Sequence, residues 1–360
     1  MVYGLISILL LGFLVLVHEL GHFLVARWSG VRILRFSIGF GSKVFGWRRG
    51  ETEYWVSWIP LGGYVKMAGE SRSEQAHQPW EYLSKSIGTR AMIIAAGPVV
   101  NYLVALITLW VVFVIGYPEL LPEVGKVVDE MPAQAAGLEV GDRIRAIDGR
   151  PVASWREMTQ AIYDSADRPL TLRIERGGAT RDVTVTPKRK EIKDPFGHTQ
   201  RVGLIGIAPS GTFETFRVGP LEAIGRTIKQ QNEWVGQTFL GLWSMLTGKL
   251  SVRESVTGPI GILYLASEAA TMGVGALLYL ISLFSLSLAI FNFFPIPILD
   301  GGHLFFLAIE KLRGIPVSVN VQERASQVSL VLLMTLVLVV CINDVNRFGL
   351  VEKVLEWVRR

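Results

Sequence analysis

The sequence has a single cysteine, Cys341, among its 360 residues, so the chain can form no internal disulfide. We interpret Cys341 as a small buried hydrophobic side chain. Charged residues are also scarce, at 19%, whereas half of the residues are hydrophobic and the mean hydropathy is positive. This balance excludes an ordinary soluble enzyme. The basic residues form no stripe with interleaved aromatic residues, so we expect no nucleic-acid partner.

Long apolar runs explain this composition. Four stretches are long and apolar enough to cross a hydrocarbon core of about 30 Å. The first lacks a basic leading region and a small-residue cleavage site, so we expect it to be retained as a membrane helix. The sequence therefore predicts a polytopic α-helical membrane protein with about four transmembrane helices, at residues 2–28, 91–117, 274–299 and 328–342.

Basic residues are concentrated between the first two spans, and none precedes the first span. Short loops rich in Lys and Arg stay in the cytoplasm, which places this loop inside and the N-terminus outside. Counting the spans onward makes residues 118–273 extracytoplasmic and puts the C-terminus outside. The basic residues of the loop are Arg32, Arg35, Lys43, Arg48, Arg49, Lys66, Arg72, Lys85 and Arg90.

The cytoplasmic loop has a pattern of its own. Residues 31–67 combine aromatic and β-branched residues in partial alternation, with a turn at residues 48–51. So many aromatic residues predict a β-rich segment that is associated with the membrane. A backbone of this kind is tolerated there only where protein buries it or where it lines a wet cavity.

The extracytoplasmic segment combines strands and helices. Strands are predicted at residues 125–129, 143–147, 170–175 and 182–186. Ser154 and Glu157 form a capping box that begins a helix reaching about residue 165. Residues 221–246 have apolar side chains on one helical face, and we favour an amphipathic helix at the membrane interface over a helix that packs on the soluble domain.

His18-Glu19-Leu20-Gly21-His22 is an HExxH sequence within the first predicted span. Residues i and i+4 share a helical face, so both imidazoles can reach one Zn²⁺, with Glu19 beside the metal-bound water. The alternative is a pair of buried histidines that only pack. Ionisable side chains are costly inside a membrane, which favours the metal site.

Two histidines and a water leave a catalytic zinc short of one protein ligand. Asp300 is the best candidate by type and depth, because the third span runs inward and ends near it, at the depth of His18 and His22. Pro295 and Pro297 break or extend that span just before Asp300. His303 is a rival ligand, and an ordinary solvated carboxylate is the other alternative for Asp300.

These residues resemble the site-2 protease family, in particular the bacterial branch that includes the regulator of sigma-E protease. The resemblance covers nearly the whole chain, through HELGH at residues 18–22, GPVVN at 97–101 and NFFPIPILDG at 292–301. It implies that His18, His22 and Asp300 bind Zn²⁺, that Glu19 is the catalytic base and that Asn292 helps to hold the substrate backbone. A packing or capping role is the alternative for Asn292.

Residues 136–144 and 147–152 resemble a PDZ module, which implies an α+β domain that binds chain ends by strand addition or acts as a steric gate. Four parts are then expected. These are a first membrane part at residues 1–117, a PDZ domain at 118–190, a region with the amphipathic helix at 191–273 and a second membrane part at 274–360.

The resemblance implies an intramembrane endopeptidase of the bacterial inner membrane. Its partners would be the lipid bilayer and single-pass membrane proteins, such as anti-sigma factors or remnant signal peptides, with no small-molecule cofactor. The alternatives are a zinc-binding PDZ scaffold without catalysis and a membrane protease that uses HExxH with a glutamate as third ligand. A scaffold has no need of Glu19, and Asp300 as third ligand would exclude the second alternative.

Overall fold

The structure is a computed structural model that describes residues 2–71, 74–251 and 255–347. Arg72 and the C-terminal residues used in the topology prediction lie outside the described residues. The chain forms two compact units, and helix α5 (Pro220–Leu246) contributes residues to both. The first unit comprises Met1–Val112, Ile224–Val235 and Ser255–Arg360, and the second comprises Phe113–Ala223 and Gly236–Glu254.

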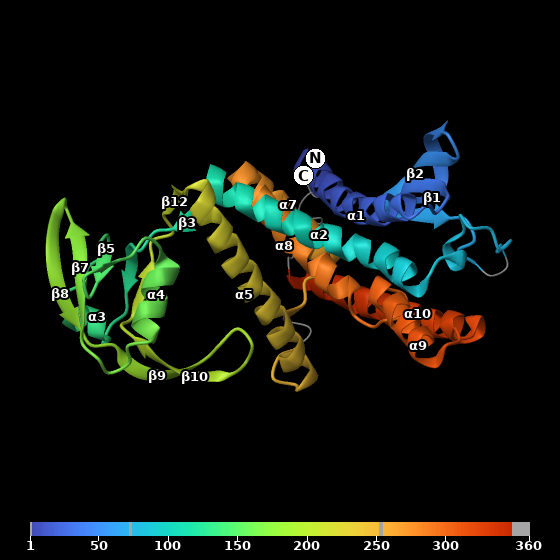
Figure 1. Cartoon of the computed structure of the whole chain (residues 1–360). Helices are drawn as coiled ribbons and strands as arrows, with labels where there is room; N and C mark the ends of the chain where they lie inside the picture. The colour runs from blue at the N-terminus through green and yellow to red at the C-terminus, as the bar shows by residue number, and fades with distance from the viewer. Residues whose placement is uncertain (1, 72–73, 252–254, 348–360) are drawn as a thin grey trace, which may run out of the picture. The chain divides into compact units, whose positions relative to one another are not determined.

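Four of the described helices are long and apolar enough to cross a membrane, in agreement with the predicted number. They are α1 (Val2–Trp28), α2 (Ile87–Ile115), α8 (Val274–Asn292) and α10 (Val319–Arg347) (Figure 1). Many of their large apolar side chains are exposed, among them Leu332 on α10. A helix that is apolar all round yet exposed is typical of contact with lipid.

The third span ends earlier than the sequence predicts. Helix α8 stops at Asn292 and not at residue 299, because Pro295 and Pro297 lack the amide hydrogens that a helix needs and disfavour helical geometry in the residues before them. The chain turns through residues 293–299 and then begins a new helix, α9 (Asp300–Arg313). Asp300 is therefore the first residue of a helix.

The predicted β-rich segment between α1 and α2 is one long antiparallel hairpin, as its alternation predicts. Strand β1 (Ile33–Arg49) pairs with β2 (Thr52–Met67), and the turn falls at Gly50, whose φ of 63° suits glycine. The base of the hairpin packs on α1, where Phe23 and Phe36 share a buried cluster. The short 3₁₀ helix η1 (Tyr82–Ser84) leads into α2. The base of β2 thus lies beside the helix that carries the HExxH residues (Figure 1).

Helix α7 (Pro259–Met272) is among the elements that the sequence patterns did not predict. It packs against α1 and α8, with Ala266 in a buried cluster that includes Leu10 and Leu14. Asp344 of α10 is fully buried and accepts the N–H groups of Gly258 and Gly261 at 3.2 and 2.8 Å. A carboxylate at a helix N-terminus satisfies amides that have no partner within the helix. The signal for this cap lies far away in the sequence.

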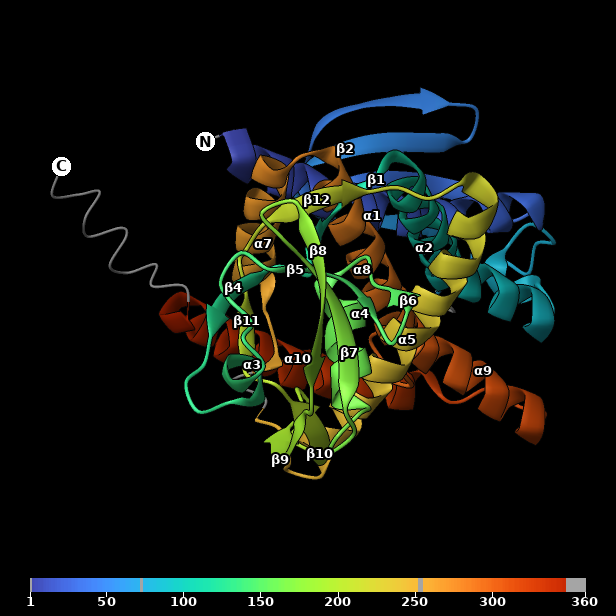
Figure 2. The same cartoon turned by 90° about the vertical axis from the view of Figure 1, so that its left-hand side faces the viewer.

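The second unit is rich in β structure. Its largest sheet has the strand order β6-β5-β7-β8, and α4 (Trp155–Tyr163) packs against it (Figure 2). The other pairs are antiparallel: β3 with β12, β4 with β11, and β9 with β10. The bounds are β3 (Tyr117–Leu120), β4 (Val124–Val127), α3 (Pro132–Ala135), β5 (Arg143–Ile147), β6 (Arg150–Pro151), β7 (Leu170–Arg176), β8 (Ala179–Val185), β9 (Lys188–Lys193), β10 (Thr199–Leu204), β11 (Ile207–Pro209) and β12 (Phe213–Phe216).

The predicted capping box is confirmed. Ser154 Oγ accepts the N–H of Glu157 at 3.2 Å, and the Glu157 carboxylate accepts the N–H of Ala153 at 3.0 Å. Helix α4 therefore begins at Trp155 and directs Met158 into the buried core of the sheet.

A buried ion pair fixes the loop before β5. Asp142 is fully buried and accepts Arg176 Nε at 2.6 Å and the N–H of Glu139 at 2.9 Å. Burial would raise the pKa of Asp142, but these hydrogen bonds outweigh it and hold the pKa below its usual value. The loop is thereby attached to β7.

Candidate metal centre

Helix α1 brings the two histidines of the HExxH sequence together. His18 and His22 lie one helical turn apart, and their Nε2 atoms are 3.2 Å from each other. The rings are nearly perpendicular, with centroids 4.8 Å apart. Both side chains are largely buried, at 12% and 11% exposure. The two Nε2 atoms therefore converge on one point.

Asp300, at the start of α9, brings a third ligand atom to the same point. Its Oδ2 lies 3.0 Å from His18 Nε2 and 3.5 Å from His22 Nε2. Gly301 and Gly302 allow this position, because a Cβ there would lie 2.2 Å from the carbonyl oxygen of Phe294 and 2.3 Å from that of Ile296, respectively. The two glycines thus let the start of α9 fold back onto the proline-containing turn.

Helix α2 supports the histidines from behind. Gly21 packs directly on α2, since a Cβ there would lie 2.5 Å from the carbonyl oxygen of Ala96. His22 Nδ1 lies 2.9 Å from the carbonyl oxygen of Ile93. A carbonyl can only accept, so Nδ1 carries the proton and Nε2 directs its lone pair at the point where the three ligand atoms converge.

A second contact ties α2 to α9. The guanidinium of Arg90 pairs with Glu310, with Nη1 3.2 Å from Oε2. Both side chains are mostly buried, at 9% and 15% exposure. Removing one partner of such a pair would leave an uncompensated charge. The pair therefore holds α9, and with it Asp300, in register with α2.

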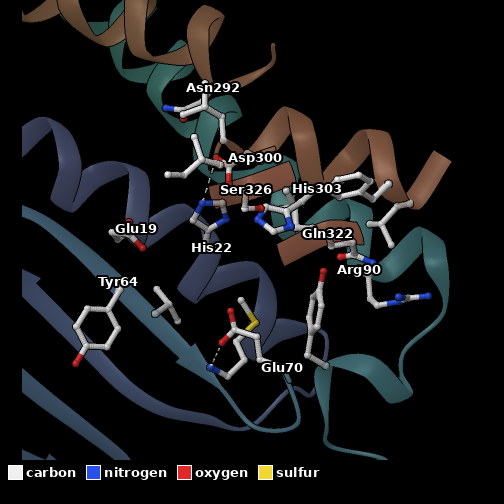
Figure 3. Close-up of a pocket in the computed structure, with 18 of the residues that line it drawn as sticks. Glu19, His22, Tyr64, Glu70, Arg90, Asn292, Asp300, His303, Gln322 and Ser326 are labelled. Carbon is white, nitrogen blue, oxygen red and sulfur yellow. Dashed lines mark hydrogen bonds and ion pairs between the residues drawn. The ribbon is translucent and has the colours of Figure 1, made fainter. Parts of the chain in front are cut away.

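The three ligand residues line a cavity of about 720 Å³ in the first unit. Glu19, Asn292 and His303 line the same cavity, and Figure 3 shows them around the pair formed by His22 and Asp300. Strand β2 runs beside Glu19, since a Cβ at Gly63 would lie 3.1 Å from its Cγ. The predicted site residues thus share one cavity.

His303 and Asn292, for which the sequence left alternative roles open, are not part of the three-residue cluster. His303 lies in the cavity but is not one of the three converging residues. The side chain of Asn292, the last residue of α8, makes no hydrogen bond to any residue that the structure describes. Its amide therefore has no helix-capping partner among those residues and stays available to another molecule.

The donor set fits zinc. Zinc–nitrogen and zinc–oxygen bonds of about 2.0–2.2 Å in a tetrahedron separate neighbouring ligand atoms by about 3.3 Å. The three observed separations are 3.2, 3.0 and 3.5 Å. Two imidazoles, one carboxylate and an open fourth position are the composition of a catalytic zinc site. Among the described residues, these three are the group that could hold a metal ion.

Sequence reasoning assigned no role to the groups on α2 that contact the histidines: the Ile93 carbonyl, Gly97 and Asn101. Asn101 Nδ2 lies 3.3 Å from His18 Nδ1, and a Cβ at Gly97 would lie 2.4 Å from His22 Nε2. Their spacing of four residues was a usable signal, because it matches the spacing of the two histidines.

The fold and site define a polytopic helical membrane protein with a zinc-hydrolase type of site. Residues 6–336 match the family described as Peptidase family M50, and the chain belongs to that family. A Rhizobium meliloti (strain 1021) relative is 38% identical over 354 aligned positions, with 94% of each chain covered.

Two further relatives carry informative names. The chain is 33% identical over 448 aligned positions to "Regulator of sigma-E protease RseP" of Escherichia coli (strain K12), with 94% of this chain and 97% of the relative covered. It is 30% identical to "Zinc metalloprotease RasP" of Geobacillus kaustophilus over 421 positions, which cover 95% and 97%. Among solved structures, the PDZ domain of an SdrC-like protein from Listeria monocytogenes matches 26% of this chain and 88% of its own, at 23% identity and a TM-score of 0.20.

Proposed function

We propose that this chain is a zinc-dependent intramembrane endopeptidase that hydrolyses peptide bonds within the membrane-spanning segments of other proteins. Membership of Peptidase family M50 and the names of the relatives support this reaction class and the use of zinc. The observation that carries the proposal is the convergence of His18, His22 and Asp300 beside Glu19, on or next to helices long enough to cross a membrane.

His18, His22 and Asp300 would hold the zinc. When bound, zinc supplies an acidified water and polarises the scissile carbonyl. Glu19 accepts the proton of that water and passes it to the nitrogen of the leaving amine. Burial of the site between α1, α2 and β2 limits bulk water and strengthens the interactions of these groups with the reacting atoms.

A substrate helix must unwind first, because its carbonyl groups are hydrogen-bonded within the helix. Gly62, Gly63 and Tyr64 of β2 line the cavity, which supports β2 as the strand that takes up the unwound segment. Asn292 would hold its backbone. Anti-sigma factors and remnant signal peptides are the proposed substrates, in regulated intramembrane proteolysis, and the name of the Escherichia coli relative supports the first of these.

Asp300→Ala is expected to lose zinc. Removal of one of three protein ligands leaves two imidazoles, so bound zinc should fall from about one equivalent per chain to below about a tenth after dialysis against a mild chelator. Zinc is measured by mass spectrometry on the full-length protein in detergent.

His303→Ala is the matched control, because His303 lines the same cavity outside the cluster. It should retain zinc near the wild-type content. Full zinc in Asp300→Ala together with loss in His303→Ala would assign the third ligand to His303 and contradict the proposal.

We also propose that residues 118–190 form a PDZ domain on the extracytoplasmic side of the bacterial inner membrane. The sheet β6-β5-β7-β8 with α4 supports this interpretation, as do the basic residues between α1 and α2. An amphipathic α5 at the membrane interface belongs to the same proposal, and exposed Leu221 and Trp243 support it.

Cysteine labelling tests this topology. In a Cys341→Ala background, Ala179→Cys on β8 should react with an impermeant thiol reagent added to spheroplasts, whereas Ala76→Cys between β2 and α2 should react only after lysis. Both alanines are exposed, so access to the reagent is set by the membrane. The reverse labelling pattern would invert the topology.

A further inference from the structure

Three groups on helix α2, spaced four residues apart, lie against the two histidines of α1. The carbonyl of Ile93 lies against His22 Nδ1, Gly97 gives the rings clearance, and the amide of Asn101 lies 3.3 Å from His18 Nδ1. Asn101 has no exposed surface. Each histidine thus has one ring nitrogen directed at the cluster and the other at a polar group of α2.

We propose that Asn101 is a positioning residue that holds His18 in the tautomer able to bind metal. The inference rests on the proposed zinc site. In the structure the amide nitrogen Nδ2 of Asn101 faces His18 Nδ1 at 3.3 Å. In the proposed orientation the carboxamide is turned by half a turn, so that Oδ1 accepts the N–H of Nδ1 and the lone pair of Nε2 is free for the metal. A carboxamide can present either its oxygen or its nitrogen after a half-turn, and only the oxygen accepts a proton from Nδ1.

The position of the proton on the His18 ring favours this orientation. If the amide nitrogen donated to Nδ1, the proton of a neutral imidazole would sit on Nε2, the atom 3.2 Å from His22 Nε2 and 3.0 Å from Asp300 Oδ2. That proton would occupy the position of the metal. Zinc-binding histidines commonly donate their other N–H to an oxygen acceptor, which fixes the ring and raises its basicity.

The backbone around Asn101 is fixed by α8. Ser285 Oγ donates to the carbonyl oxygen of Asn101 at 2.8 Å, and Ser282 Oγ donates to that of Ala105 at 2.7 Å. Both serines are fully buried. The bond from Ser285 holds the backbone of Asn101 itself, so the Asn101 side chain has little freedom to follow a displaced ring.

The alternative is an asparagine that only fills space between the helices. Replacement by leucine separates the two roles, because leucine has a similar volume and no hydrogen-bonding group. Replacement by aspartate keeps the oxygen acceptor and removes the amide nitrogen. Ser282→Ala is the matched control, since it removes a buried interhelical hydrogen bond one turn away without contacting His18.

Zinc affinity is measured on the full-length protein in detergent by competition with a chromophoric chelator, and thermal unfolding is followed in excess chelator. Asn101→Leu should bind zinc about 10- to 100-fold more weakly than wild type. Asn101→Asp should stay within a few-fold of wild type, and so should Ser282→Ala. Cobalt substitution adds a spectroscopic test, because a displaced His18 would change the visible absorption of the bound metal.

Wild-type zinc affinity in Asn101→Leu would overturn the proposal, whatever the behaviour of Asn101→Asp. A loss in Ser282→Ala equal to that in Asn101→Leu would also overturn it, because the effect would then follow from helix packing. If wild type binds zinc and Asp300→Ala does not, while Asn101→Leu binds normally, the metal site stands and only the role of Asn101 fails.

Discussion

Glu19→Gln is expected to slow peptide hydrolysis by on the order of 10²–10⁴-fold while the zinc content stays near that of wild type. The amide has nearly the shape of the carboxylate but cannot accept the proton of the attacking water. It also leaves the three converging ligand atoms unchanged, since Glu19 is not among them. The measurement is cleavage of a purified transmembrane model substrate in detergent, together with the zinc content of the same preparation.

Glu70→Gln is the matched control for this experiment. Glu70 lines the same cavity and its carboxylate accepts the N–H of Met67 at 3.2 Å, so the substitution makes the same chemical change away from the cluster. Its cleavage rate should stay within a few-fold of wild type. Wild-type cleavage by Glu19→Gln would exclude Glu19 as the base.

Local patterns predict a large part of this molecule. The four-residue spacing of His18 and His22 predicts that both rings reach one point, and their Nε2 atoms are indeed 3.2 Å apart. The Ser154 capping box predicts the start of α4, and the turn at residues 48–51 predicts the hairpin. In each case the information lies within a few residues of the feature that it determines.

Features that depend on contacts between distant segments could not be predicted in this way. The cap of α7 comes from Asp344, more than eighty positions along the chain. The role of Gly97 depends on how closely α1 approaches α2, which hydropathy does not report. Asp300 is an intermediate case. Its chemistry and expected depth indicated the site, but its 3.0 Å separation from His18 follows from the turn before α9, where the predicted span had continued to residue 299.

Gly97→Ala is expected to lose zinc and hydrolysis together. The added Cβ would lie 2.4 and 2.6 Å from Nε2 and Cε1 of His22 and 2.8 Å from Cε1 of His18. These distances are far shorter than a van der Waals contact, so either the rings or the helices must move. The His22 ring is held at the Ile93 carbonyl, and α1 already packs against the α2 backbone at Gly21. Movement of the rings breaks the convergence on the metal.

The size of the change in zinc affinity shows whether Gly97→Ala displaces the metal ligands or only lowers the stability of the protein. Overpacking alone costs about 1–3 kcal/mol, which would lower the melting temperature without changing zinc affinity in the protein that remains folded. Displaced ligands should instead weaken zinc binding by at least about 10- to 100-fold. Gly88→Ala is the control on the same helix, since the nearest atom to a Cβ there is Ser86 Oγ at 4.0 Å. It should keep wild-type zinc affinity. If Gly97→Ala also kept it, the close approach of α2 would not be what positions the metal ligands, and the support that we assign to this helix would fail with it.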